Sequence, residues 1–165
     1  MKKILGVLSI ALMVSCGSSD SPQDTNTSND NTNVNQNANI VNEFTIKAVG
    51  NTMQEMAFDI KELEVKAGST VKITLVNEGI DASMIHNIVF VKMGTRQEVA
   101  MACVAAGPDK QFVADNNPNI IAYSGLANPQ QTIQLEFVAP AKGSYEYLCT
   151  YPGHSDMMKG WLYVE

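Results

Sequence analysis

The chain has 165 residues, of which 45% are hydrophobic and 17% charged, and its formal net charge is −6. It contains no run of lysine and arginine, and clustered basic residues are the usual mark of nucleic-acid binding. The charge pattern therefore argues against a nucleic-acid partner. Only two histidines and three cysteines are present, which leaves few residues for histidine-based catalysis or for disulfides.

The N-terminus is typical of an exported lipoprotein. Met1-Lys2-Lys3 is basic, residues 4–14 are almost wholly apolar, and Ser15-Cys16-Gly17 follows. The apolar stretch is too short to span a membrane. We predict a lipoprotein-type signal peptide at 1–15 and a lipid on Cys16, which would anchor the protein to a membrane facing the periplasm or the cell surface. The alternative is an ordinary cleaved signal in which Cys16 has no role.

Residues 16–40 are predicted to be a disordered tether, and residues 41–165 a single domain. The tether is rich in Ser, Asn and Asp and has almost no aliphatic side chains before Ile40. Such a segment cannot bury enough apolar surface to offset the entropy lost on ordering.

Within the domain, short alternations of apolar and polar residues recur between turn signals, which is the pattern of a β-sandwich. Strands are predicted at 44–49, around 58–60, and at 63–65, 71–76, 85–90, 132–138, 145–148 and 161–164. The last two flank a loop and should pair as neighbours. From Thr95 to Ala106 the alternation is lost and Ala, Met and Val predominate, so this stretch predicts a short helix that Gly107-Pro108 ends.

The loop between the last two strands carries the residues with the clearest chemistry. Cys149, His154 and either Met157 or Met158 offer a thiolate, an imidazole and a thioether within ten residues. These ligand types suit copper in a trigonal His₂Cys site with a long axial methionine. The only other histidine, His86, would complete the plane. Each residue alone is more often a packing residue, but their combination predicts a metal site.

The same residues resemble those of the azurins, a family of blue copper proteins with the cupredoxin fold. The resemblance rests on Cys149-Thr150-Tyr151-Pro152-Gly153-His154, on Met158, and on His86-Asn87 after Met84. It implies an all-β fold, a cupredoxin Greek-key β-sandwich with a short helical flap. It also implies a type 1 copper centre, with one Cu(II)/Cu(I) ion per chain, and a single-electron carrier as the function.

The resemblance also assigns roles around the copper. His86, Cys149, His154 and Met158 correspond to the ligands, which favours Met158 over Met157. Asn87 corresponds to a residue that hydrogen-bonds to the cysteine-containing loop. Azurins offer a weak backbone carbonyl ligand from a glycine before the first histidine; here that position is Ile85, a departure from the family.

A docking surface for redox proteins is implied around the edge of the His154 ring. The residues concerned share a place near the copper in the family pattern: Met56, Met84, Tyr151, Pro152, Gly153 and Met157, with Asp156 as a charged departure at the rim. The partners would be an electron donor and an acceptor, such as a cytochrome or a copper enzyme, and the protein would be a monomer.

The predicted ligand set also bears on other classes of function. A four-ligand site leaves no position for a substrate, and multicopper oxidases and copper nitrite reductases need more histidines than this chain has, so we expect no enzyme activity. The alternative function is copper delivery to an enzyme outside the cytoplasm. A third hypothesis is a cupredoxin domain that has lost copper binding and serves in adhesion, but the intact ligand residues argue against it. Cys103, in an Ala-rich segment, is expected to be a small buried residue rather than a second metal or redox thiol.

Overall fold

The structure is a computed structural model that describes residues 40–165. The predicted signal peptide 1–15, Cys16 and the tether up to residue 39 lie outside the described residues. Within the described part, no helix is both long enough and apolar enough to cross a membrane.

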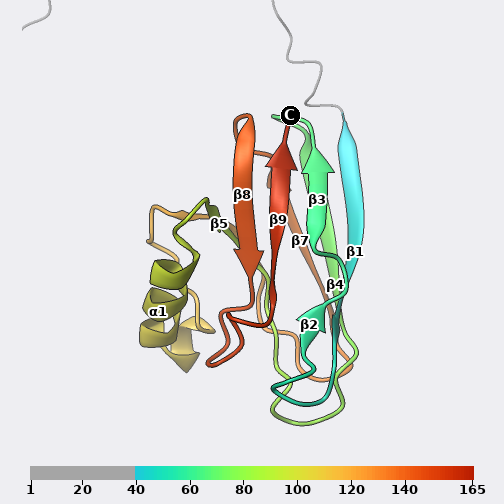
Figure 1. Ribbon diagram of the computed structural model, residues 1–165, viewed down its shortest axis with the longest axis vertical. Coiled ribbons are helices and arrows are strands. Elements are labelled where there is room, and N and C mark those ends of the chain that lie inside the picture. The colour runs from blue at the N-terminus through green and yellow to red at the C-terminus, as the bar shows by residue number, and fades with distance from the viewer. Residues whose placement is uncertain (1–39) are drawn as a thin grey trace, which may run out of the picture. The chain divides into compact units, whose positions relative to one another are not determined.

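Two β-sheets pack face to face (Figure 1), so the predicted all-β sandwich is confirmed. The four-stranded sheet has the order β2-β1-β4-β7, made of β2 (Ala57–Phe58), β1 (Val41–Val49), β4 (Thr70–Asn77) and β7 (Thr132–Val138). The five-stranded sheet has the order β3-β9-β8-β5-β6, made of β3 (Glu62–Val65), β9 (Lys159–Val164), β8 (Gly143–Leu148), β5 (Val89–Lys92) and β6 (Ile120–Tyr123). The pairs β1–β4 and β3–β9 are parallel, and the other pairs are antiparallel.

The core lies between the sheets and follows the alternation seen in the sequence. In β4, Val71, Ile73 and Leu75 are at most 1% exposed, whereas Lys72 between them is exposed. Successive side chains of a strand point to opposite faces of the sheet, so one face of β4 enters the core. From the facing sheet, Tyr147 on β8 packs into the same core.

In residues 40–165 the one α-helix, α1 (Arg96–Ala106), lies outside the sandwich, and the predicted helical flap is confirmed. It ends at Gly107, whose φ of 78° suits glycine, and a 3₁₀ turn η2 (Pro108–Lys110) follows. Val99 and Cys103 of α1 pack against Val91 and Leu148 in a second, smaller apolar cluster. The helix therefore covers the outer face of β5 and β8.

Two strand predictions need correction. The predicted strand 85–90 begins only at Val89, because His86 forms an isolated bridge to Ala127 instead of pairing with a strand. Strand β6 was not predicted; it is short and pairs only with β5, across a shift of register between Phe90 and Val91. The predicted pairing of the last two strands is confirmed, with Leu148 opposite Lys159.

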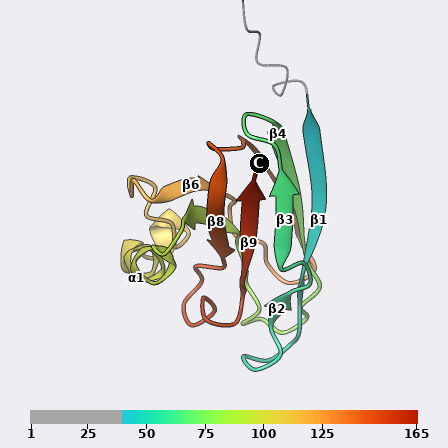
Figure 2. The same cartoon turned by 45° about the horizontal axis from the view of Figure 1, so that its top comes forward.

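The connection between β8 and β9, residues 149–158, lies at the end of the sandwich away from the C-terminus. Figure 1 and the turned view in Figure 2 both show it between α1 and β2. We call residues 149–158 the metal loop. The fold thus places the residues with the clearest chemistry beside the helix, although the helix precedes them by about fifty residues in the chain.

Candidate metal centre

Three side chains from two distant segments meet at this end of the sandwich. The Nδ1 atoms of His86 and His154 are 3.1 Å apart, and the Sγ atom of Cys149 lies 3.9 Å from the first and 3.7 Å from the second. None of the three residues is more than 1% exposed. They are the only group of three or more His, Cys, Asp or Glu residues in residues 40–165 whose ligand atoms lie close enough to hold a metal ion.

The triangle fits a transition-metal ion. Bonds from such an ion are about 2.0–2.1 Å to imidazole nitrogen and about 2.3 Å to thiolate sulfur, so three ligand atoms around one ion lie roughly 3–4 Å from one another. One thiolate and two imidazoles are the equatorial ligands of blue copper sites. The donor set therefore suits copper, and His86, Cys149 and His154 are its candidate ligands.

The metal loop is held in shape by its own backbone. The Cys149 N–H donates to the Met158 carbonyl at 3.0 Å, which closes the loop directly after β8. Inside the loop, the Met158 N–H donates to the His154 carbonyl at 2.9 Å. Gly153 has a φ of 84°, a left-handed conformation that glycine adopts without strain. These backbone contacts fix residues 149, 154 and 158 relative to one another.

His86 is placed by a connecting segment rather than by the predicted strand. Its backbone exchanges two hydrogen bonds with Ala127, of 3.1 and 2.7 Å. The buried side chain of Asn77, at the end of β4, donates from Nδ2 to the carbonyls of Met84 and Ala127 at 2.7 and 3.0 Å. Asn77 thus anchors the segments on both sides of the bridge. Its role was not predicted, since an Asn after a strand is usually a turn residue.

The His86 ring depends on this backbone support. Its Nε2 is the one buried side-chain nitrogen or oxygen in the described residues without a hydrogen-bond partner. Histidines that bind metals usually donate their second ring N–H to a neighbouring acceptor. Here packing and the bridge to Ala127 orient the ring instead.

Asn87 ties this segment to the metal loop, as predicted. Its Oδ1 accepts a hydrogen bond from the Thr150 N–H at 2.8 Å, and its Nδ2 donates to the Thr150 hydroxyl at 2.8 Å. The Thr150 hydroxyl donates in turn to the Phe112 carbonyl at 2.7 Å. Both Asn87 and Thr150 are fully buried, so these bonds join the residues next to His86 and Cys149.

Burial sets the protonation states of the three ligands. It raises the pKa of the Cys149 thiol to about 12, against the opposing effect of hydrogen bonds from backbone N–H groups of Asn87 and Tyr151. It lowers the pKa of His86 to about 4, with a further contribution from the charge of His154, and that of His154 to about 4. Both imidazoles are therefore neutral and able to ligate at neutral pH, and metal binding must displace the thiol proton.

The two methionines of the loop differ sharply in burial. Met158 is fully buried, whereas Met157 is 45% exposed. A buried thioether at the closed end of the loop agrees with the choice of Met158 as the axial ligand, which stays a prediction. The Ile85 carbonyl also stays a prediction, with the Ile85 side chain half-buried.

The predicted docking surface needs correction. Met56 and Met84 are each only 1% exposed and belong to the core, so their placement on the surface was wrong. Met84 is buried partly because it packs closely against Gly79: a Cβ atom on Gly79 would lie only 2.7 Å from the Met84 Cβ. The exposed methionine beside the loop is Met53, which is 42% exposed and whose Cε lies within 3.0 Å of a Cβ built on Gly153.

The other predicted surface residues lie on the metal loop. Tyr151 and Pro152 are half-buried, Gly153 is exposed, and the Asp156 side chain is 89% exposed. The Tyr151 ring lies 4.9 Å from the His154 ring, measured between centroids. We call Met53, Tyr151, Pro152, Gly153 and Met157 the loop patch.

Cys103 is a buried structural residue, as predicted. It is 0% exposed, and its Sγ accepts a hydrogen bond from the Ala114 N–H at 3.3 Å. Burial raises the pKa of its thiol, which keeps it protonated. In the described part of the chain it forms no disulfide.

Comparison with known proteins agrees with this centre. The chain is 42% identical to auracyanin-A of Chloroflexus aurantiacus over 118 residues, which cover 70% of this chain and 72% of that protein. It is 31% identical to azurin of Pseudomonas fluorescens biotype C over 120 residues, 69% of this chain and 94% of that protein.

Solved structures give the same result. The structure of auracyanin A, a "blue" copper protein from Chloroflexus aurantiacus, superposes with a TM-score of 0.68 and 39% identity, over 76% of this chain and 99% of that chain. The family model of copper binding proteins of the plastocyanin/azurin family matches residues 44–165. This chain therefore belongs to the plastocyanin/azurin family of blue copper proteins, which are electron carriers.

Proposed function

We propose that this protein passes single electrons between redox proteins outside the cytoplasm while a lipid on Cys16 holds it at a membrane. The observation that carries the proposal is the buried triangle of His86, Cys149 and His154. Bound copper would accept and release one electron by changing between Cu(II) and Cu(I). The chain's own part is to hold the ligands in one geometry and to keep water away from them.

The rigidity of the site supports electron transfer. Two buried hydrogen bonds join Asn87 to Thr150, and a third closes the metal loop between Cys149 and Met158. A site with one fixed geometry needs little rearrangement when its charge changes by one. Met158 would serve as the long axial ligand, which tunes the potential of such sites.

An enzymatic role is not proposed. The three ligand residues are each at most 1% exposed. No other group of three or more His, Cys, Asp or Glu residues in residues 40–165 could hold a metal ion. A substrate would need an open ligand position at a site that solvent can reach.

The loop patch would be the contact surface for donor and acceptor proteins. It combines two flexible exposed methionines with a half-buried tyrosine that lies against the His154 ring. Methionine side chains adapt to different partners, and weak redox encounters use small interfaces. Asp156, beside the loop patch, would influence the approach of charged partners.

The lipid anchor and the tether would keep a monomeric domain near the membrane while letting it reach partners. This part of the proposal rests on the sequence alone. It is tested by washing membranes of the native host with 1 M salt, a concentration at which charge attraction is screened within about 3 Å. The native protein should stay in the membrane and leave it with detergent, whereas a Cys16→Ala variant should be found in the wash.

Copper delivery is the alternative function, and copper retention separates the two. The purified protein, loaded with Cu(I), is mixed with a competing Cu(I) chelator and the loss of metal is followed with time. A carrier should keep its copper for hours while exchanging electrons reversibly with ascorbate and ferricyanide. Rapid transfer of copper to the chelator, with slow or irreversible redox cycling, would favour delivery.

A further inference from the structure

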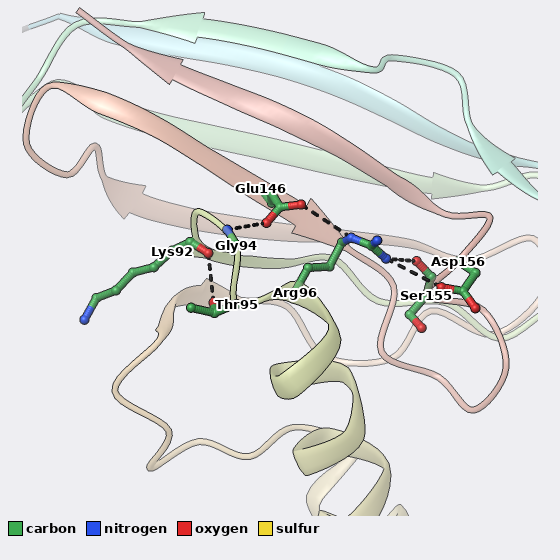
Figure 3. Close-up of polar contacts among 7 residues, drawn as sticks. All are labelled: Lys92, Gly94, Thr95, Arg96, Glu146, Ser155 and Asp156. Atoms are coloured by element: carbon green, nitrogen blue, oxygen red, sulfur yellow. Dashed lines mark hydrogen bonds and ion pairs between the residues drawn. The ribbon is translucent and has the colours of Figure 1, made fainter.

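The chain has a single arginine, Arg96, and its side chain bridges the helix to the metal loop. Arg96 is the first residue of α1, and its side chain is only 22% exposed. Figure 3 shows its guanidinium group between β8 on one side and the metal loop on the other.

On the β8 side, Arg96 meets a carboxylate that is itself fixed. The Arg96 Nε lies 3.4 Å from Oε1 of Glu146, whose side chain is 12% exposed. The second oxygen, Oε2, accepts a hydrogen bond from the Gly94 N–H at 2.8 Å. Glu146, which lies three residues before Cys149, thus contacts both the turn before α1 and the side chain of Arg96.

On the loop side, Arg96 reaches the backbone between two ligands. Its Nη1 donates a hydrogen bond to the Ser155 carbonyl at 3.0 Å and lies 3.7 Å from Oδ1 of Asp156. Ser155 and Asp156 come directly after His154 and precede Met158. The Asp156 arm is exposed and contributes little, so the bond to the Ser155 carbonyl is the structural link.

We propose that Arg96 is a positioning residue for the copper site, which fixes the metal loop between His154 and Met158 against Glu146 of β8. This inference rests on the proposed function, because it assigns Arg96 an effect on the ligands of that site. A planar guanidinium can serve both sides at once, since it offers several N–H donors in a rigid fork. A lysine ammonium is a single point of charge, so Arg96→Lys would keep the charge and lose the double contact.

The first test uses the metal-free protein and needs no copper. Hydrogen exchange is measured at the Met157 and Met158 amides, which donate to the His154 carbonyl, and at core amides of β4 for reference. Arg96→Ala and Arg96→Lys should each speed exchange at Met157 and Met158 by about tenfold or more, while the β4 amides change by less than about threefold. Unchanged exchange at the loop amides in Arg96→Lys would overturn the proposal.

A neighbouring residue provides the matched control. Thr95 donates from its hydroxyl to the Lys92 carbonyl at 2.8 Å, in the turn before α1, and has no hydrogen bond to the metal loop. Thr95→Ala should leave loop exchange like that of the parent. An equal increase in Thr95→Ala would mean that any disturbance of the start of α1 loosens the loop, and would overturn the specific role of Arg96.

The second test uses the copper-loaded protein. The Arg96 variants should change the visible and electron paramagnetic resonance spectra of the Cu(II) form and lose copper to a chelator about tenfold faster, with Thr95→Ala like the parent. Parent-like spectra and retention in both Arg96 variants would overturn the effect on the site. If the parent itself forms no blue centre while the exchange difference persists, the proposed function fails and the attachment of the loop by Arg96 stands.

Discussion

Asn87 and Thr150 are joined by two buried hydrogen bonds of 2.8 Å, each between residues that directly follow a copper ligand. Asn87 follows His86 on the segment before β5, and Thr150 follows Cys149 on the metal loop. These neighbouring polar groups therefore help to set the distance between His86 and Cys149. A site built in this way should keep its geometry when copper is absent.

Removing the Asn87 side chain should destabilise the protein. Asn87→Ala leaves the buried Thr150 N–H without its acceptor, which should lower the free energy of unfolding by roughly 1–3 kcal/mol. Urea unfolding of the metal-free protein measures this. Asn42 offers a control, since its Nδ2 donates to the Ser69 hydroxyl at 2.9 Å in a half-buried place near the start of β1. Asn42→Ala should have the smaller effect and leave copper binding unchanged; equal stability of Asn87→Ala and the parent would contradict the account.

The metal-free protein should lose stability as the pH falls from about 6.5 to about 4. The pKa values of His86 and His154 are both lowered to about 4 in the folded state from a usual value of 6.5. In this window the unfolded chain binds protons that the folded protein excludes, so acid favours unfolding. The urea concentration at the midpoint of unfolding should therefore decrease as the pH is lowered from 7 to 4.5.

Carboxylates also titrate near the lower end of this range, so the double variant His86→Gln/His154→Gln serves as the control. Its urea midpoint should depend less on pH over the same window. If the parent and the double variant show the same pH dependence, the two histidines are not buried and neutral in the folded state.

Substitution of the two loop methionines should separate the axial ligand from its neighbour. Met158→Leu keeps the buried volume and removes the thioether, so the reduction potential should shift and the Cu(II) spectrum should change. Met157→Leu alters only an exposed side chain and should leave both unchanged. Spectroelectrochemical titration of the two variants measures the potential. A shift in Met157→Leu alone would contradict the choice of Met158 and identify Met157 as the axial ligand.

The charge of Asp156 should act on the encounter with a partner. With a basic c-type cytochrome as electron donor, Asp156→Lys should slow association several-fold at low ionic strength and much less at high salt, while affinity changes less. Stopped-flow reduction measures the rate. Glu43→Lys, an equal charge change on β1 where the side chain is 72% exposed, should have a smaller effect. An unchanged rate for Asp156→Lys would remove Asp156 from the docking rim.

The meeting of His86, Cys149 and His154 could be predicted because histidine and cysteine are rare in this chain and two of the three residues lie on one loop. Cys149, His154 and Met158 occur within ten residues, and His86 is the only other histidine. The sandwich could be predicted because alternating burial follows directly from the pleat of a strand, as β4 shows. Strand β6 lacked that signal, since it is short and pairs on one side only.

The roles of Arg96 and Asn77 could not be predicted, because their partners are distant in the chain. Asn87, whose partner Thr150 is 63 residues away, was predicted only through the family resemblance. Arg96 meets a carbonyl 59 residues away, and Asn77 meets one 50 residues away. Nothing in the local sequence of either residue signals such a contact. The burial of Met56 and Met84 could not be predicted either, because it depends on how the connections between strands pack at the end of the sandwich. The methionine that is exposed beside the metal loop is Met53.

The visible spectrum of the purified protein on addition of Cu(II), recorded beside Cys149→Ser, tests the central claim most directly. We predict an intense blue absorption band that ascorbate bleaches, that ferricyanide restores, and that is absent in Cys149→Ser. Its absence from the parent protein, or its persistence without the Cys149 thiol, would contradict a blue copper centre formed by His86, Cys149 and His154.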